Sequence, residues 1–190
     1  MKKKSLLSLF LVLFLGTGVL KSQTVSNSLT DVILKGYEPK IMTEKPITDN
    51  QIKLILECGL RAPSARNRQL WKFTVLKDKA LIDEVIPNFT SGNVLIVISG
   101  QEAAPEGTNV DIDCALATGF MLIGAQSIGL GGHIYTGPVN SVNATKRPAL
   151  GIPEGYKVIT LLRIGNFDNT VDAISSASTR KSLQEVVNYK

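Results

Sequence analysis

Residues 61–73 read RAPSARNRQLWKF, and they join an amphipathic helix to a strand. Pro63 and Ser64 stop the helix, and Asn67 and Gln69 then offer amide donors and acceptors from a loop held between two rigid elements. Loops held in this way often carry ligand sites. The stretch therefore predicts a binding loop or, more simply, a helix-to-strand connector that precedes a buried tryptophan.

The segments on either side of this loop have clear periodicities. Thr48 and Gln51 match a capping box, and apolar residues then recur at helical spacing, which predicts a helix over residues 49–60. After the loop, Trp71 begins an alternation of apolar and polar residues that predicts a strand over residues 71–76.

The rest of the chain alternates between helical and extended patterns. The apolar run 94–98 predicts a strand buried on both faces. Residues 111–128 predict the longest helix, apolar nearly all round and therefore central, which Gly129 ends in the left-handed conformation. The remaining expected elements are a short helix at 78–86, strands at 133–136 and 156–164, and a last helix from Ser182 to about Tyr189. The fold class is α+β in one domain, residues 24–190.

The first 23 residues are typical of a secretory signal peptide. Three lysines, residues 2–4, precede the apolar run 6–15, which is short for a membrane span of roughly 20 residues. Cleavage is expected near Ser22 or Gln23. Because Leu20 is large for a cleavage site, an uncleaved N-terminal anchor is the alternative.

Charge and composition exclude several functions. Of the 21 basic residues, four are lysines within the first 23 residues, so the mature chain carries 17 against 16 acidic residues. This balance does not support nucleic-acid binding. Cys58 and Cys114 are too few for a disulfide framework and are expected as buried free thiols. With His133 as the one histidine, neither a metal site nor a Cys-His or Ser-His hydrolase is expected.

Four segments together resemble the nitroreductase family. Residues 62–71 resemble its APSxxNxQPW-type motif, with Leu70 in place of the usual proline. Residues 113–131 are similar to its central helix ending in AxxxGLG, residues 150–156 to its LGIPEGY turn, and residues 180–187 to its C-terminal segment. The resemblance covers about residue 46 to the C-terminus. It implies a layered fold with a central, mainly antiparallel sheet flanked by helices, a homodimer with two FMN sites at its interface, and ping-pong electron transfer through the flavin.

The resemblance also implies which residues hold the flavin. Pro63, Ser64 and Asn67 would hold the ring and ribityl chain, and Thr136 and Gly137 match the turn whose backbone N–H faces the flavin N5. Three further glycines, at positions 129, 131 and 132, permit close backbone approach, although helix termination and turn formation explain Gly129 equally well.

One departure from the family concerns the phosphate. The usual RRSxR motif is replaced by residues 36–40, in which only Lys40 keeps a positive charge and Glu38 adds a negative one. A phosphate site without its arginine fork should bind free FMN weakly. Either the flavin is lost or something else holds it.

The C-terminal region suggests what could hold it. Residues 172–179, DAISSAST, resemble the motif at which flavin transferases attach FMN through its phosphate to a hydroxyl. The match implies Ser178 as the attachment point, with Thr179 second, and Arg180 matches a family residue near the phosphate. The alternative is a Ser/Thr-rich loop that caps the last helix.

The export signal bears on partners and on function class. It predicts a periplasmic or other extracytoplasmic location, where a flavin transferase and a membrane or periplasmic electron donor are the expected partners. The alternatives to an FMN-dependent oxidoreductase are a flavin-free or flavin-storing binding protein on the same fold, and a flavin electron carrier without a substrate of its own.

Overall fold

The computed structural model describes residues 28–168 and 178–190. The predicted signal peptide and residues 172–177 of the C-terminal motif lie outside this part of the chain. The helices are α1 (Ser28–Lys35), α2 (Asp49–Leu60), α3 (Lys79–Asp83), α4 (Val110–Ser127), α5 (Val139–Ser141) and α6 (Leu183–Val186), with a 3-10 turn at Ala65–Asn67 and a π-helical turn at Val142–Lys146. The strands are β1 (Trp71–Leu76), β2 (Val94–Gln101), β3 (Gly131–Tyr135) and β4 (Tyr156–Gly165).

A single antiparallel sheet organises the fold, with strand order β1-β2-β4-β3. The central strand β2 is buried from Val94 to Gly100, as its continuous apolar run predicts. The alternation in β1 places Trp71 and Leu76 in the cores on opposite faces of the sheet. The predicted α+β fold with an antiparallel sheet flanked by helices is confirmed.

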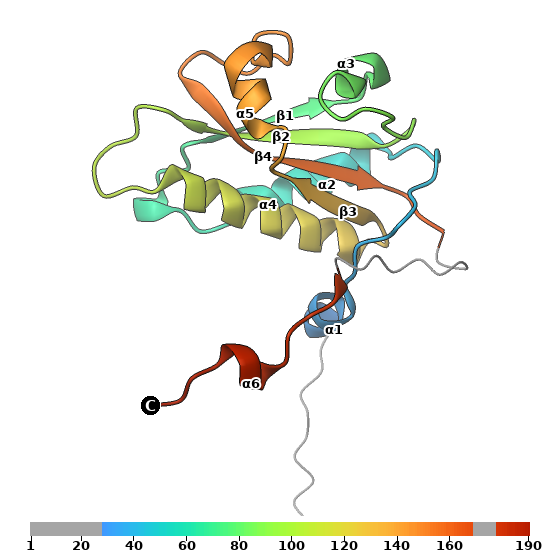
Figure 1. Cartoon of the computed structure of the whole chain (residues 1–190), viewed down its shortest axis with the longest axis vertical. Helices are drawn as coiled ribbons and strands as arrows, with labels where there is room; N and C mark the ends of the chain where they lie inside the picture. Colours follow the sequence, from blue (N-terminus) through green and yellow to red (C-terminus); the bar gives the residue numbers. More distant parts are fainter. Residues whose placement is uncertain (1–27, 169–177) are drawn as a thin grey trace, which may run out of the picture.

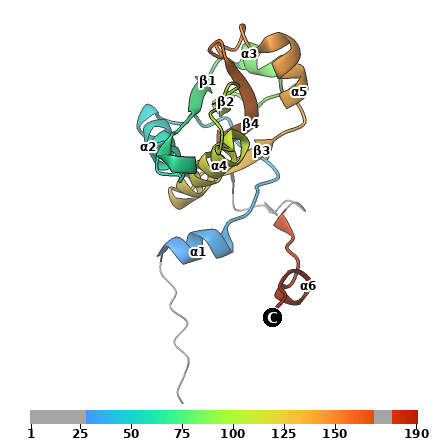
Figure 2. The ribbon, with the colours of Figure 1, turned by 90° about the vertical axis from the view of Figure 1, so that its left-hand side faces the viewer.

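Helices cover both faces of this sheet (Figures 1 and 2). On one face α2 and α4 form the larger core together with residues of β1, β2 and β4. On the other face α3 and the segment after α5 form the second core, which includes Ile82, Val142 and Leu150. Because β1 and β3 are the edge strands, they lie at opposite sides of the sheet. The predicted binding loop precedes β1, and Thr136 and Gly137 follow β3.

The helices α2 and α4 pack closely because each has a glycine at the contact. A Cβ atom on Gly124 of α4 would lie 2.7 Å from the Cys58 Sγ, and a Cβ atom on Gly59 of α2 would lie 2.6 Å from the Met121 Cε. Next to this contact the buried hydroxyls of Thr118 and Thr160 share a hydrogen bond of 2.6 Å that joins α4 to β4.

Gly124→Ala is expected to destabilise the chain by about 1–2 kcal/mol, because the clash with Cys58 outweighs the gain in helix propensity. The matched control is Gly119→Ala in the same helix, where an added Cβ atom would meet nothing within 4 Å. That variant should gain stability, by up to about 1 kcal/mol. Urea unfolding of the two variants measures the difference, and equal midpoints would show that the helices do not pack as described.

The predicted elements are observed, with several differences at their boundaries. The helix α1 and the helical segment 139–146 were not predicted. The helix α3 ends at Asp83 rather than Ile86, β3 begins at Gly131 rather than His133, and α6 ends at Val186 rather than near Tyr189. The helix α4 is central, but one apolar stripe remains exposed: Ile112, Leu116 and Phe120. Within residues 28–168 and 178–190, no helix is both long enough and apolar enough to cross a membrane.

Candidate functional site

The loop between α2 and β1 is clamped to the start of α4. The Ala65 backbone N–H donates to both carboxylate oxygens of Asp113, at 3.1 and 3.2 Å, and Asp113 is only 4% exposed. The Ser64 Oγ accepts the Gln69 backbone N–H at 3.1 Å, which closes the loop on itself. Charged acceptors form the stronger class of hydrogen bonds, so the loop is held rigidly. The clamp by Asp113 was not foreseen from the sequence.

The tip of this loop has a strained backbone. Three residues that are not glycine have a positive φ: Arg66 and Asn67 at 54° and Gln69 at 52°. The Gln69 side-chain amide donates to the Asn67 Oδ1 at 3.0 Å. Such conformations persist where surrounding contacts enforce them, and they cluster at ligand sites. Pro63 and Asn67 are exposed and Ser64 is half-buried, so the loop presents the predicted residues at the surface.

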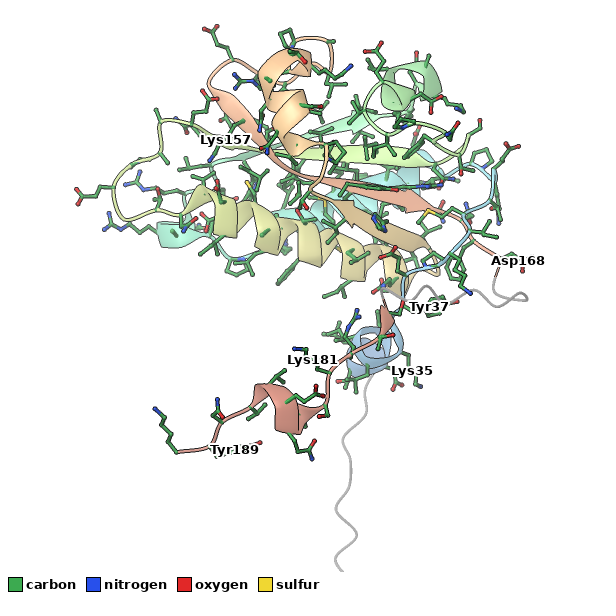
Figure 3. The ribbon with its side chains drawn as sticks, viewed as in Figure 1. Lys35, Tyr37, Lys157, Asp168, Lys181 and Tyr189 are labelled. Atoms are coloured by element: carbon green, nitrogen blue, oxygen red, sulfur yellow. The ribbon has the colours of Figure 1, made fainter. Side chains whose placement is uncertain are left out.

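A second group of predicted residues lies where the C-terminal segment contacts the segment before α2. The Glu38 backbone N–H donates to the Ser178 Oγ at 2.9 Å, and the Glu38 carboxylate bonds to the Nδ1 of His133 on β3. In Figure 3, Tyr37 and Lys181 mark the two chain segments that meet here. A cavity of about 230 Å³ opens beside them, lined by Gly36, Tyr37, Glu38, Leu122, Gln126, Gly132, Ile134 and Arg180.

The other predicted residues do not line this cavity. Thr136 and Gly137 follow directly after β3, whose Gly132 and Ile134 line it, and both are exposed, as is Lys40. An added Cβ atom on Gly137 would meet nothing within 4 Å. In contrast, the space beside Gly131 and Gly132 is filled by Pro39 and Leu122, respectively. Those two glycines therefore allow close packing within the chain, and Gly132 also lines the cavity.

The two groups lie at opposite ends of α4. Asp113, in its first turn, anchors the loop, whereas Gln126, in its last turn, lines the cavity. Thirteen residues at 1.5 Å each separate these ends by about 20 Å. Figure 1 shows the same separation, with the end of α2 beside the start of α4 and α1 near its other end. The predicted site residues of one chain are therefore not brought together into one site.

Two further features are not part of these groups. Both cysteines are free, and burial, with a smaller contribution from Asp111 and Asp113, raises the pKa of the Cys114 thiol to about 12, so it stays protonated. Cys58 is only half-buried, so its expected burial is partial. A larger hollow of about 780 Å³ lies beside the π-helical turn, where Arg147 is already paired with Glu102 and bonded to the Tyr156 carbonyl at 2.8 Å.

Comparison with known proteins agrees with this architecture. Residues 40–93 match the model of the nitroreductase family. A protein of Archaeoglobus fulgidus, named as a candidate NADH dehydrogenase/NAD(P)H nitroreductase, is 28% identical over 136 residues, which cover 66% of this chain and 78% of that protein.

Solved structures extend the similarity to most of the chain. A nitroreductase of Desulfovibrio desulfuricans in complex with FMN has a TM-score of 0.74 and 24% identity, covering 87% of this chain and 98% of that one. A nitroreductase of Bacteroides fragilis with bound FMN has a TM-score of 0.71 and 18% identity, covering 87% and 100%. The fold is nitroreductase-like. Residues 40–93 in addition match the family model in sequence.

Proposed function

We propose that the chain is an FMN-dependent oxidoreductase of nitroreductase type, which works by ping-pong electron transfer as a homodimer. The observation that carries this proposal is the clamped loop of Ser64 and Asn67, with its strained backbone and its position inside the segment matched by the family model. Solved structures of the same fold carry FMN, which supports FMN as the proposed cofactor.

The residues fit a flavin when two copies of the chain combine. The loop of one copy and the cavity group of the other would form one site, because the two groups of a single chain lie about 20 Å apart. Exposed apolar side chains offer the surface for this association: the stripe on α4, together with Leu29, Ile33 and Leu34 on α1. Tyr189 of the C-terminal segment, which is 91% exposed in the single chain, would also pack against the second copy. Large exposed apolar patches of this kind mark interaction sites.

Each group has a distinct role in holding the cofactor. The Asn67 amide and the Ser64 side chain would bind the ring and ribityl chain, and the backbone N–H groups of Thr136 and Gly137 would face the reactive edge of the ring. Lys40, Pro63 and Arg180 complete the proposed contacts. When bound, FMN supplies the electron-transfer chemistry, while the protein supplies binding, orientation and electrostatics.

Asn67→Gly is expected to weaken non-covalent FMN binding about 3- to 10-fold, because one hydrogen bond is worth about 0.5–1.5 kcal/mol. Glycine adopts the positive φ at this position without strain, so stability should change by less than about 1 kcal/mol. Asn67→Ala should lose the same affinity and, in addition, about 1–2 kcal/mol of stability. Fluorescence titration and urea unfolding separate the two effects. Unchanged flavin affinity in both variants would remove Asn67 from the site.

The finer proposal is that FMN is joined covalently to Ser178. A flavin transferase would use FAD as the donor: the Ser178 Oγ forms an ester bond to the phosphorus, the diphosphate bond breaks, AMP leaves, and the hydroxyl proton is released. The described structure supports this only in that Ser178 lies beside Glu38 and near the cavity. Covalent attachment would explain how the site retains FMN although Lys40 is the one positive charge left in residues 36–40, which replace the family's phosphate motif.

Extracytoplasmic action is the part of the proposal that rests on residues 1–23. With export, a membrane or periplasmic redox protein is the electron donor. A chain kept in the cytoplasm would instead use NAD(P)H, the donor in the name of the Archaeoglobus relative. N-terminal sequencing of the protein from an envelope fraction is expected to give a start near Gln23 or Thr24. Retention of Met1 on a cytoplasmic protein would contradict the proposal.

The proposed function is tested by the visible absorption of the purified protein and by titration with FMN. Flavin bands, or saturable binding followed by reduction with an artificial donor and reoxidation by a nitroaromatic acceptor, are the expected results. Glu38, the negative charge at the phosphate end, is the observation that favours the alternative of a flavin-free binding protein on this fold. A protein that binds no flavin under any condition would establish that alternative.

A further inference from the structure

A hydrogen-bonded pair of a carboxylate and an imidazole, Glu38 and His133, lies where the phosphate end of the flavin is proposed to lie. The Glu38 carboxylate is bonded to the His133 imidazole, and the two side chains are only 27% and 32% exposed. The His133 ring in turn contacts the Tyr135 ring, with centroids 4.1 Å apart. The carboxylate is thus fixed by its partner and its surroundings, and it cannot move into water without breaking the pair.

The same residue touches the proposed attachment point through its backbone. The Glu38 N–H donates to the Ser178 Oγ at 2.9 Å. A phosphorus atom esterified to that oxygen would be one bond from an atom already in contact with Glu38. The carboxylate of Glu38 and a bound phosphate would therefore be close neighbours.

We propose that the Glu38–His133 pair selects the form of the flavin tail: it disfavours the dianionic phosphate of free FMN and accepts a singly charged phosphodiester or an uncharged ribityl end. This inference rests on the proposed flavin site. The chain would accordingly hold riboflavin, or FMN esterified to Ser178, in preference to free FMN.

The charges around the cavity support this selection. Among the described residues that line it, Glu38 is the one acid and Arg180 the one cation, and the Arg180 guanidinium also donates to the Thr179 carbonyl at 3.0 Å. A phosphate monoester carries about −1.5 to −2 charges at pH 7, whereas a diester carries one. Together with the neighbouring His133, the described lining therefore carries at most one net positive charge, which is too little to balance a dianion. If the pair only joined the segment before α2 to β3, its removal would change the affinities for FMN and riboflavin equally.

The test compares the affinities for FMN and riboflavin in the full chain expressed without a flavin transferase, so that Ser178 is unmodified. The wild type should bind FMN no more tightly than riboflavin. Glu38→Gln removes the charge at constant shape and should raise FMN affinity about tenfold while leaving riboflavin affinity unchanged. His133→Gln leaves the carboxylate without its partner and should lower FMN affinity further, again with riboflavin unchanged. Glu44→Gln, at an exposed acid of the same segment, is the matched control and should change neither affinity.

The outcomes separate the inference from the proposed function. A wild type that binds FMN more than about tenfold better than riboflavin would overturn the inference and leave the flavin site standing. The same holds if Glu38→Gln and His133→Gln both leave the ratio of the two affinities unchanged. If neither flavin binds to the wild type or to any variant, both the proposed function and the inference fail.

Discussion

Asp113→Ala is expected to lower the free energy of unfolding by about 1.5–3 kcal/mol and to weaken flavin binding more than any single change in the loop itself. The reason is that the buried carboxylate receives the Ala65 N–H with both of its oxygens and is the link between the loop and α4. Hydrogen bonds to charged groups contribute in this range. Without that link, the strained conformation at residues 66–69 loses one of the contacts that enforce it. Thermal or urea unfolding and a flavin titration measure the two effects.

The matched control is Asp111→Ala in the same first turn of α4. Asp111 also interacts favourably with the helix dipole, but it is exposed, and its ion pair with Lys157, at 3.0 Å, is exposed as well. Exposed ion pairs contribute about 0–1 kcal/mol, so this variant should remain close to the wild type in stability and in flavin affinity. Equal losses in the two variants would mean that the clamp on Ala65 has no special role.

Gly137→Trp is expected to abolish flavin binding without lowering stability. No heavy atom of the described residues lies within 4 Å of an added Cβ atom at this exposed position, so they leave room for the larger side chain. The indole would instead occupy space beside the turn after β3, where the flavin is proposed to lie. We expect a loss of affinity of at least about 100-fold, because the ring and the indole cannot occupy the same volume.

Two variants control for this substitution. Gly137→Ala should keep most of the flavin affinity, because a methyl group reaches little of the proposed site. Asn140→Trp places the same indole three residues further along, at an exposed position of α5. It should leave flavin binding unchanged. Full flavin affinity in Gly137→Trp, measured on a protein with wild-type stability, would move the proposed site away from this turn.

Local patterns in the sequence predicted most of the fold. The capping box of Thr48 and Gln51, the apolar run of β2 and the positive φ of Gly129 are all observed, because each depends on residues within a few positions of one another. The helix α1 lacked such a signal. Its apolar residues Leu29, Ile33 and Leu34 remain exposed in the single chain, so they do not join a core within it.

The site was less accessible from the sequence, for a physical reason. The contact between Glu38 and Ser178 joins residues 140 positions apart, and the clamp of Ala65 by Asp113 spans 48 positions. No periodicity reports contacts over such separations. The resemblance to nitroreductases identified the loop and the C-terminal residues, but not the Glu38–His133 pair, which places an acid beside the site of the missing arginine fork. The flavin-binding roles of the individual residues, the attachment to Ser178 and the export signal remain predictions.

The central claim is that one flavin site combines the loop of one chain with the cavity group of a second chain. The most direct measurement uses a heterodimer of differently tagged chains, in which one copy carries Asp113→Ala and the other Gly137→Trp. In this heterodimer one site keeps both of its groups intact, so we predict half of the wild-type flavin content, bound with wild-type affinity, although each variant alone binds flavin poorly. A heterodimer as deficient as its two parents would contradict the claim, because it would place both groups of each site in the same chain.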